Sequence, residues 1–386
     1  MDTCWPRWVV LSLATLLVSC DRPSKSAVAA TIPVASEGAP RGRDANDAGR
    51  FLAGLPGTPG SPFADLESQD VWKAHRRELD KGWRKFEKER LPSMRDFQAN
   101  ELSSQAIEKS LLFYPFSGPD ALAITVFFPH NPTYVLVGLE PPGTLPTPSQ
   151  LARKNLGSAL AAERGTIHSE LYRSFFITKQ MDSQFRGQVT DGLLAPLLQL
   201  LVRTKHTVLG YRYVQLNDAG EIVERGSAAP SGARNRGVEI DFSADADQSI
   251  HKLFYFSVNL SDEKLRENKP FLAFLSGFQE VTSYFKATSY MTHKPQFSII
   301  RDQVLAKSQA ILQDDSGIPY RFFQPPVWRV QLYGDYARPY GSFRWLEQHD
   351  LRKAYNTSGP KPLNFGIGYG FRRIPSNLLL ATKTAR

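Results

Sequence analysis

Residues 111–139 read LLFYPFSGPDALAITVFFPHNPTYVLVGL, and this stretch decides the fold that the sequence predicts. It contains three apolar or aromatic runs, Leu111–Phe116, Ala121–Phe128 and Thr133–Leu139. The runs are separated by Ser117–Asp120 and Pro129–Pro132, whose compositions are typical of turns. We therefore expect three short strands that follow one another as a β-meander.

The C-terminal half of the chain predicts further strands joined by short turns. Thr207–Leu216 and Glu221–Arg225 flank Asn217–Gly220, which is a good hairpin turn, and Gly237–Phe242 and Lys252–Asn259 form a similar pair. The remaining expected strands are Tyr320–Phe323, Val327–Tyr333, Leu363–Tyr369 and Asn377–Thr382.

Helices are predicted from apolar residues that recur at steps of three and four. Trp72, His75, Leu79, Trp83 and Phe86 form such a stripe, with Asp70 as the expected N-cap. The other expected helices are Ser149–Arg164, Ala195–Arg203 and Phe297–Gln313. Strands and helices that occur in separate groups predict an α+β fold with a largely antiparallel or mixed β-sheet and several packed amphipathic helices.

The N-terminus has a different character. Arg7 precedes the apolar run Trp8–Val18, which is shorter than the roughly 20 residues that a membrane-spanning helix needs. Such a run is typical of a secretory signal. Its ending, Leu17-Val18-Ser19-Cys20, resembles the lipobox of bacterial lipoproteins. The resemblance implies a signal peptide over residues 1–19, cleavage before Cys20, and a diacylglycerol anchor with fatty acids such as palmitate on the Cys20 thiol.

A lipoprotein signal predicts a protein of the cell envelope. We expect the chain to be lipid-anchored on the periplasmic or extracytoplasmic face of the cell membrane. Asp21 resembles the signal that keeps lipoproteins of enteric bacteria in the inner membrane, but this rule does not hold for all bacteria, so inner and outer membrane both stay open. Only Cys4 accompanies Cys20, so the processed chain has no pair of cysteines for an internal disulfide. The net charge of +9 would suit nucleic acid or anionic lipid, but export argues against a nucleic-acid partner.

Composition divides the processed chain in two. Residues 20–60 are rich in alanine, serine, glycine and proline and show no period, which predicts a lipidated cysteine followed by a flexible tether. Residues 61–386 contain the predicted strands and helices. We expect them to form a single globular α+β domain.

Standard catalytic signatures are missing from the sequence. It contains no nucleophile elbow, no zinc-protease motif, no P-loop and no C-x-x-C pair, and its histidines do not have metal-ligand spacing. The sequence therefore predicts neither a cofactor nor a metal. Gly366–Gly370 lacks the context of a nucleotide loop and indicates a glycine-rich strand where backbones approach closely.

Two acidic segments are the candidates for chemistry. Asp314 and Asp315 follow a predicted helix, where acids oppose the helix dipole, and Arg321 lies nearby. Asp120 and Glu140 lie at the ends of predicted strands. The adjacent carboxylates Asp314 and Asp315 could bind a cation, or one of them could act as a base. Paired carboxylates such as Asp120 and Glu140 could perform glycoside-type hydrolysis if they converge. The alternative is that these acids only stabilise their own turns.

The sequence favours an envelope protein with a binding or structural role, with a possible partner in the cell-wall glycan or in another envelope protein. The alternative function is an envelope hydrolase that acts on a glycan through Asp120, Glu140, Asp314 or Asp315. The aromatic residues of one segment either form a buried corner or present a platform for sugar rings; they are Trp328, Tyr333, Tyr336, Tyr340 and Trp345.

Overall fold

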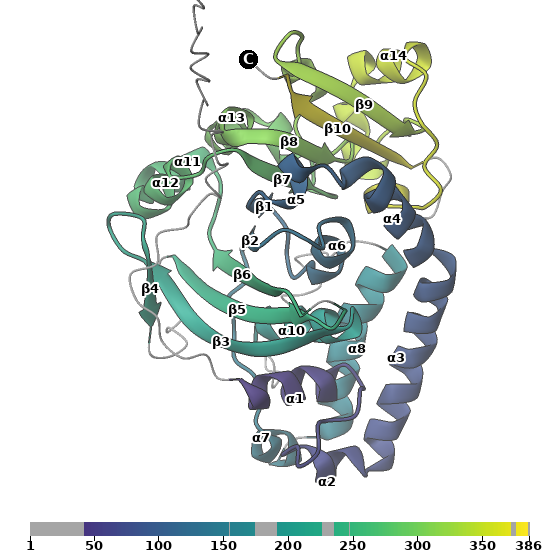
Figure 1. Cartoon of the computed structure of the whole chain (residues 1–386), viewed down its shortest axis with the longest axis vertical. Coiled ribbons are helices and arrows are strands. Elements are labelled where there is room, and N and C mark those ends of the chain that lie inside the picture. Colours follow the sequence, from purple (N-terminus) through teal and green to yellow (C-terminus); the bar gives the residue numbers. More distant parts are fainter. Residues whose placement is uncertain are drawn as a thin grey trace, which may run out of the picture.

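A computed structural model describes residues 42–153, 155–173, 191–225, 235–246, 248–371 and 376–384 (Figure 1). The predicted signal peptide and Cys20 lie outside these residues. The described residues form an α+β fold around one ten-stranded mixed sheet, as the sequence predicts. No helix among them is both long and apolar enough to cross a bilayer.

The middle of the sheet is parallel. Its strand order is β4-β3-β5-β6-β2-β1-β7-β8-β10-β9, and the five strands β6, β2, β1, β7 and β8 run in one direction. Their bounds are β1 Leu112–Pro115, β2 Thr133–Gly138, β6 Ile250–Ser257, β7 Val281–Phe285 and β8 Ser308–Gln313. The flanking antiparallel strands are β3 His206–Leu216, β4 Ile222–Arg225, β5 Arg236–Ala244, β9 Trp328–Gly334 and β10 Asn377–Lys383.

The predicted meander is wrong at its centre. Ala121–Phe127 forms helix α6, and this helix is the crossover that makes β1 and β2 parallel. Every residue of α6 is buried, so its sequence lacks the polar face that normally reveals a helix. The chain continues from β1 to β2 on one side, whereas β7 pairs with β1 on the other side. The strand order therefore reverses between β1 and β7, which is the kind of position where open α/β sheets bind ligands.

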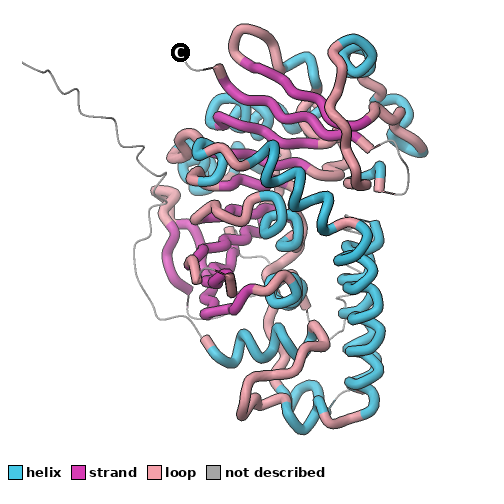
Figure 2. Tube along the Cα trace, turned by 45° about the vertical axis from the view of Figure 1, so that its right-hand side comes forward, coloured by secondary structure: helices cyan, strands magenta, loops and turns pink. Residues whose placement is uncertain are grey.

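Helices cover both faces of the sheet. Leu112 and Tyr114 of β1 pack into the core that contains α6 and α10, whereas Phe113 faces the core formed with α11, α12 and α13. The long helix α3 runs along one side of the molecule in Figures 1 and 2 and packs against α8. The helix bounds are α1 Arg43–Leu52, α2 Ala64–Glu67, α3 Asp70–Glu89, α4 Leu91–Phe97, α5 Gln105–Glu108, α7 Pro148–Arg153, α8 Leu156–Arg173, α10 Leu194–Arg203, α11 Asp262–Glu267, α12 Lys269–Ser276, α13 Ser298–Lys307 and α14 His349–Thr357.

The predicted stripe on α3 is confirmed, because the five residues of that stripe are the buried residues of the helix. The N-cap is Gln69 instead of Asp70. The helix expected over Ser149–Arg164 is divided into α7 and α8, and α8 continues to Arg173. The hairpin β3–β4 and the pair β5–β6 are confirmed, as are β9, β10 and α10.

The expected tether is wrong from Arg43 onward. Residues 43–52 form α1, whose Phe51 is fully buried and stacks on Phe63 and Trp72. The indole N–H of Trp72 donates a hydrogen bond to the carbonyl of Phe51 (3.0 Å). The carboxylate of Asp47 accepts from Thr58, which fixes the chain that follows α1. The folded domain therefore includes the residues from Gly42 onward. The composition of this segment was misleading because polar residues of α1 such as Asn46 and Asp47 are buried by tertiary contacts.

Three other predictions of secondary structure are also wrong. The helix that begins near Phe297 ends at Lys307, and Ser308–Gln313 forms β8. Tyr320–Phe322 is a 3-10 turn, and the expected strand Leu363–Tyr369 is a loop that leads into a short 3-10 turn. A buried strand and a buried helix give similar apolar runs, which explains the first error.

Candidate functional site

The carboxyl ends of the parallel strands bring together most of the predicted acidic residues. Asp120 follows β1, Glu140 follows β2, and Asp314 and Asp315 follow β8. The two aspartates therefore follow a strand, so the expected opposition to a helix dipole does not apply to them. Lys286 directly follows β7 at the same edge and was not predicted from the sequence.

Lys286 lies in a buried group of charged residues. Its Nζ atom is 2.6 Å from Oδ2 of Asp120 and 2.9 Å from Oε1 of Glu170 on α8. The side chains of all three residues are at most 3% exposed. The phenol of Tyr114 donates to the same oxygen of Asp120 (2.8 Å). We call these four residues, together with Arg90 and Tyr284, the Lys286 cluster.

Local structure explains how the sequence positions Asp120. The residue is the N-cap of α6, and its Oδ1 atom accepts from the backbone N–H of Ala123 (3.1 Å). An N-cap carboxylate satisfies a backbone donor of the first turn and is favoured by the helix dipole. The second oxygen is left for Tyr114 and Lys286.

Burial and neighbouring charges shift the pKa values of the cluster. Burial, reinforced by the charge of Asp120, raises the pKa of Glu170 to about 7, and Lys286 limits this increase. Burial alone would lower the pKa of Lys286, but the two carboxylates raise it above its usual value. Burial lowers the pKa of Arg90. The ammonium of Lys286 is thus held firmly, whereas Glu170 can change its protonation near neutral pH.

Three buried polar atoms of the cluster have no hydrogen-bond partner among the described residues. They are Nε of Arg90, Oε2 of Glu170 and the hydroxyl of Tyr284. The Nη atoms of Arg90 donate to the carbonyls of Leu171 (3.1 Å) and Gly366 (3.0 Å), so the guanidinium is fixed in place. A buried polar atom without a partner costs about 1–3 kcal/mol, and such atoms are few in native proteins.

The loop after β7, which we call the β7 loop (Lys286–Tyr290), has an unusual backbone. Ala287, Ser289 and Tyr290 have φ angles of 52°, 54° and 53°. Residues other than glycine rarely adopt this left-handed conformation, which costs on the order of 1–2 kcal/mol each. Phe116, at the end of β1, has a φ of 60°. Strained backbone therefore concentrates at the strand ends that carry Lys286 and Asp120.

Asp314 and Asp315 support the β7 loop. Oδ2 of Asp314 accepts from the N–H of Ala287 (2.8 Å), and Oδ2 of Asp315 accepts from the hydroxyl of Tyr290 (2.6 Å). Burial raises the pKa of Asp314. Burial and the adjacent Asp314 raise the pKa of Asp315 to about 7. Both carboxylates therefore accept hydrogen bonds from other groups of the protein.

The expected close approach of backbones at Gly366–Gly370 occurs in a loop instead of a strand. At Gly368, with a φ of 54°, an added Cβ atom would lie 2.1 Å from Oδ2 of Asp314. The hydroxyl of Tyr369 accepts from the N–H of Ser289 (3.1 Å). The glycine-rich segment therefore covers the β7 loop.

Glu140 and Arg321 are not part of this arrangement. Oε2 of Glu140 accepts from the N–H of Leu139 (3.2 Å), and its carbonyl accepts from Tyr255 (2.7 Å). Arg321 is exposed, and its guanidinium lies 5.1 Å from the ring centroid of Phe322. The structure thus groups Asp120, Asp314 and Asp315 at one edge and leaves the other two predicted site residues apart.

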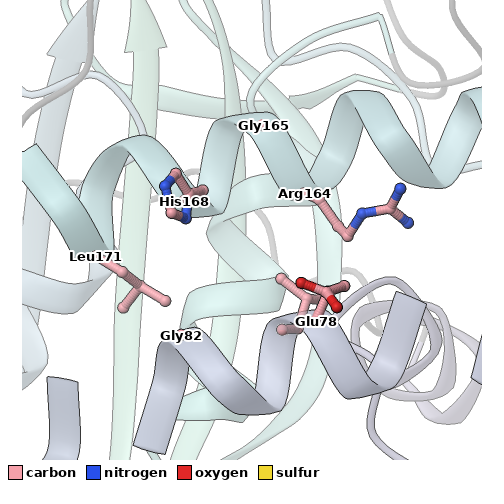
Figure 3. A pocket seen from close by; sticks show the side chains of 7 residues that line it. Glu78, Gly82, Arg164, Gly165, His168 and Leu171 are labelled. Carbon is pink, nitrogen blue, oxygen red and sulfur yellow. The ribbon is translucent and has the colours of Figure 1, made fainter. Parts of the chain in front are cut away.

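Two of the hollows in the described part of the chain have well-defined linings. One, of about 280 Å³, lies between α3 and α8. Figure 3 shows Arg164 and His168 of α8 on one side of it and Glu78 of α3 on the other. The second, of about 240 Å³, is lined by the Pro141–Thr144 turn and by Tyr213, Arg225 and Arg236, among others. Neither is lined by a residue of the Lys286 cluster, although Leu171 of the first follows Glu170.

Metal-binding residues are not grouped in the described residues, where no set of three or more histidine, cysteine, aspartate or glutamate side chains could hold an ion.

Lys286 and Glu170 could not be found from the sequence, because 116 positions separate them and neither belongs to a motif. A usable signal for Lys286 was its position after Val281–Phe285, a short segment rich in β-branched and aromatic residues.

Comparisons with protein-family models, with curated proteins and with solved structures found no match. The function of the chain must therefore be inferred from its own residues.

Proposed function

We propose that the chain is a lipid-anchored protein of the bacterial cell envelope whose domain binds a small, uncharged, hydroxyl-bearing ligand at the Lys286 cluster. The N-terminal run and the lipobox-like ending at Cys20 support the anchor and the extracytoplasmic location. The position of the cluster, at the reversal of strand order between β1 and β7, supports a ligand site.

The observation that carries the binding site is the burial of Lys286 between Asp120 and Glu170 beside a strained loop. A protein in which well-packed apolar residues replace a buried ion pair is often as stable as the original, or more stable. Left-handed residues such as Ala287 and Ser289 also reduce stability. The buried ion pair and the left-handed residues lie at the same edge of the sheet, and both lower the free energy of unfolding. Local features that reduce stability are typical of functional sites.

The chemistry of the cluster favours an uncharged ligand. The cations Arg90 and Lys286 balance the carboxylates Asp120 and Glu170. The unpartnered atoms include a donor on Arg90, an acceptor on Glu170, and the hydroxyl of Tyr284, which can do both. A ligand hydroxyl can accept from one of these atoms and donate to another. Sugars of the cell-wall glycan are ligands of this class that an envelope protein meets.

Hydrolysis is the weaker alternative. A glycosidase needs two carboxylates that face one bond, with a separation of roughly 5–9.5 Å. Asp120 is bound by Lys286 and Tyr114, and Asp314 by the β7 loop, so both are engaged within the protein. Among the described residues, the geometry favours binding over bond cleavage.

The anchor is tested with a Cys20→Ala variant expressed from the full chain. We expect wild-type protein in the membrane fraction, with a mature N-terminus at Cys20 and the mass of a lipid-modified cysteine. The variant should lack the lipid and leave the membrane fraction in a high-salt wash. A wild-type chain that retains residues 1–19, or that carries no fatty acid, would refute the anchor.

The ligand site is tested with Tyr284→Phe. This substitution removes a buried hydroxyl that has no partner in the described protein, so the folded state should become more stable by about 1 kcal/mol. The probe is the uncharged disaccharide of N-acetylglucosamine, titrated by calorimetry. Loss of one hydrogen bond should weaken binding about tenfold.

Tyr134→Phe is the matched control. The Tyr134 hydroxyl is equally buried but donates to the carbonyl of Phe128 (2.7 Å). This variant should lose stability and keep its affinity. The proposed site fails if the wild-type protein does not bind the disaccharide, or if Tyr284→Phe binds it as tightly as wild type.

A further inference from the structure

The segment Arg338–Glu347, which leads into α14, presents aromatic side chains to solvent. Trp345 is 79% exposed and Tyr340 is 61% exposed, and they are among the most exposed large apolar residues of the described chain. The expected buried corner is thus only partly present, since Trp328 and Tyr333 are buried. Exposed aromatic residues in a soluble domain often mark a surface that meets a partner or a membrane.

This segment is held rigidly by the fold. Phe343, between the two exposed residues, packs 5.2 Å from Tyr290 and 5.3 Å from Tyr369, measured between ring centroids. The N–H of Gln348 donates to the hydroxyl of Tyr336 (2.9 Å). Trp345 and Tyr340 are therefore presented by a fixed support and are not the tip of a free loop.

The same surface is basic. Residues 338–361 contain Arg338, Arg344, Arg352, Lys353 and Lys361 against Glu347 and Asp350. Lys361 also pairs with Glu101 (2.8 Å), so five positive charges stand against three negative charges and the local net charge is +2. Glu347 is neutralised by Arg338 (3.1 Å) and Arg352 (2.8 Å). An anionic surface would complement this charge.

We propose that Trp345 and Tyr340 dock the domain onto an anionic lipid bilayer. Tryptophan and tyrosine concentrate at the headgroup level of membranes, and arginine binds phosphate well. The guanidinium of Arg344 lies 4.5 Å from the ring centroid of Trp345, so one face of the indole carries a cation. Arg344 beside the indole supplies donors for a lipid phosphate, so this pair suits an anionic headgroup better than an uncharged sugar. The proposed lipid anchor would place the domain beside such a surface, but the docking itself needs no anchor.

The experiment uses the processed chain with Cys20→Ala, which carries no lipid, so the result does not depend on the anchor. Four tryptophans remain in this chain, and Trp72, Trp83 and Trp328 are at most 6% exposed. Fluorescence changes on adding vesicles will therefore report mainly on Trp345. With phosphatidylglycerol–phosphatidylcholine vesicles we expect a blue shift and protection from acrylamide, both weakened by 0.5 M salt. Pure phosphatidylcholine should have little effect.

Vesicle flotation then tests the two side chains directly. Trp345→Ala and Tyr340→Ala should each reduce binding to the anionic vesicles several-fold. Ile250→Ala is the control, because Ile250 is 67% exposed at the amino end of β6, away from the edge that carries Phe343. The proposal is refuted if Trp345 does not respond to vesicles or if Ile250→Ala loses as much binding. A Trp345 response to soluble cell-wall polysaccharide in place of vesicles would assign the surface to a glycan. Either result leaves the disaccharide test at Tyr284 independent.

Discussion

Replacing Glu170 with glutamine should stabilise the protein at pH 8 and change it little at pH 5. Burial and Asp120 raise the pKa of Glu170 from its usual 4.5 to about 7 in the folded protein. The unfolded chain therefore loses this proton at a lower pH than the folded chain. Glu170 contributes stability that is fully present below pH 4.5, is lost progressively as the pH rises, and is gone above about pH 7. Glutamine cannot ionise, and its amide oxygen can still accept from Lys286.

The magnitude follows from the two pKa values. The difference corresponds to about 3 kcal/mol, at 1.36 kcal/mol for each pKa unit. Between pH 5 and pH 8 the wild-type protein should therefore lose about 2–3 kcal/mol relative to Glu170→Gln. Contributions from Asp315 and from the buried histidines occur in both proteins and cancel in the difference.

Urea unfolding at pH 5, 6, 7 and 8 measures this difference. Glu78→Gln, which changes an exposed glutamate of α3, is the control and should stay within about 0.5 kcal/mol of wild type at each pH. The reasoning is refuted if Glu170→Gln is less stable than wild type at pH 8, or if the difference does not change with pH. Either result would mean that Glu170 remains ionised well below neutral pH and that its pair with Lys286 stabilises the fold.

Three further substitutions test the fold around the site. Phe51→Ala should reduce the free energy of unfolding by about 3–5 kcal/mol, since Phe51 is fully buried, and a loss below about 1 kcal/mol in urea unfolding would show that α1 is not part of the domain. Gly368→Ala should lower stability by at least about 2 kcal/mol, because the new methyl group would meet Asp314 in a left-handed backbone, and an unchanged Tm would contradict this contact. Ala287→Gly should raise the Tm and add about 1 kcal/mol by relieving a left-handed alanine, so a lower Tm would mean that the conformation is not strained.

The outer elements could be predicted because each has a face that contacts water or an end that is marked by a turn, and both features are visible in the sequence. The β3–β4 hairpin has a clear turn at Asn217–Gly220, and α3 shows a polar face opposite its buried stripe. In the parallel centre, β1, β2 and β6 were predicted from their apolar runs, but an element that is buried on all sides has no polar face to distinguish a helix from a strand. As a result, α6 resembles a strand, β8 resembles the end of a helix, and β7 was not predicted at all.

The candidate site could be predicted only one residue at a time. Asp314 and Asp315 were found as acids that follow a predicted helix, and Asp120 was found as an acid at the end of a predicted strand. Their partners Lys286 and Glu170 come from β7 and α8, and only the folded chain brings these elements together. Glu140 was found by the same criterion as Asp120, and Arg321 was found by its position near Asp315, but both lie apart from the cluster. Position in a loop therefore identifies candidates, whereas convergence depends on which strands are parallel.

The helix that was mistaken for a strand also explains why a charge can be buried at Asp120. A strand would offer Asp120 no free backbone donors in its first turn, whereas the start of α6 offers the N–H of Ala123. That bond leaves the other carboxylate oxygen to hold Lys286, which in turn holds Glu170 and thereby fixes α8 against the sheet. A ligand hydroxyl bound between Glu170 and Tyr284 would add to this chain of contacts. The contacts that position the proposed site therefore also connect α6 to α8. We expect ligand binding to change how α8 packs against the sheet.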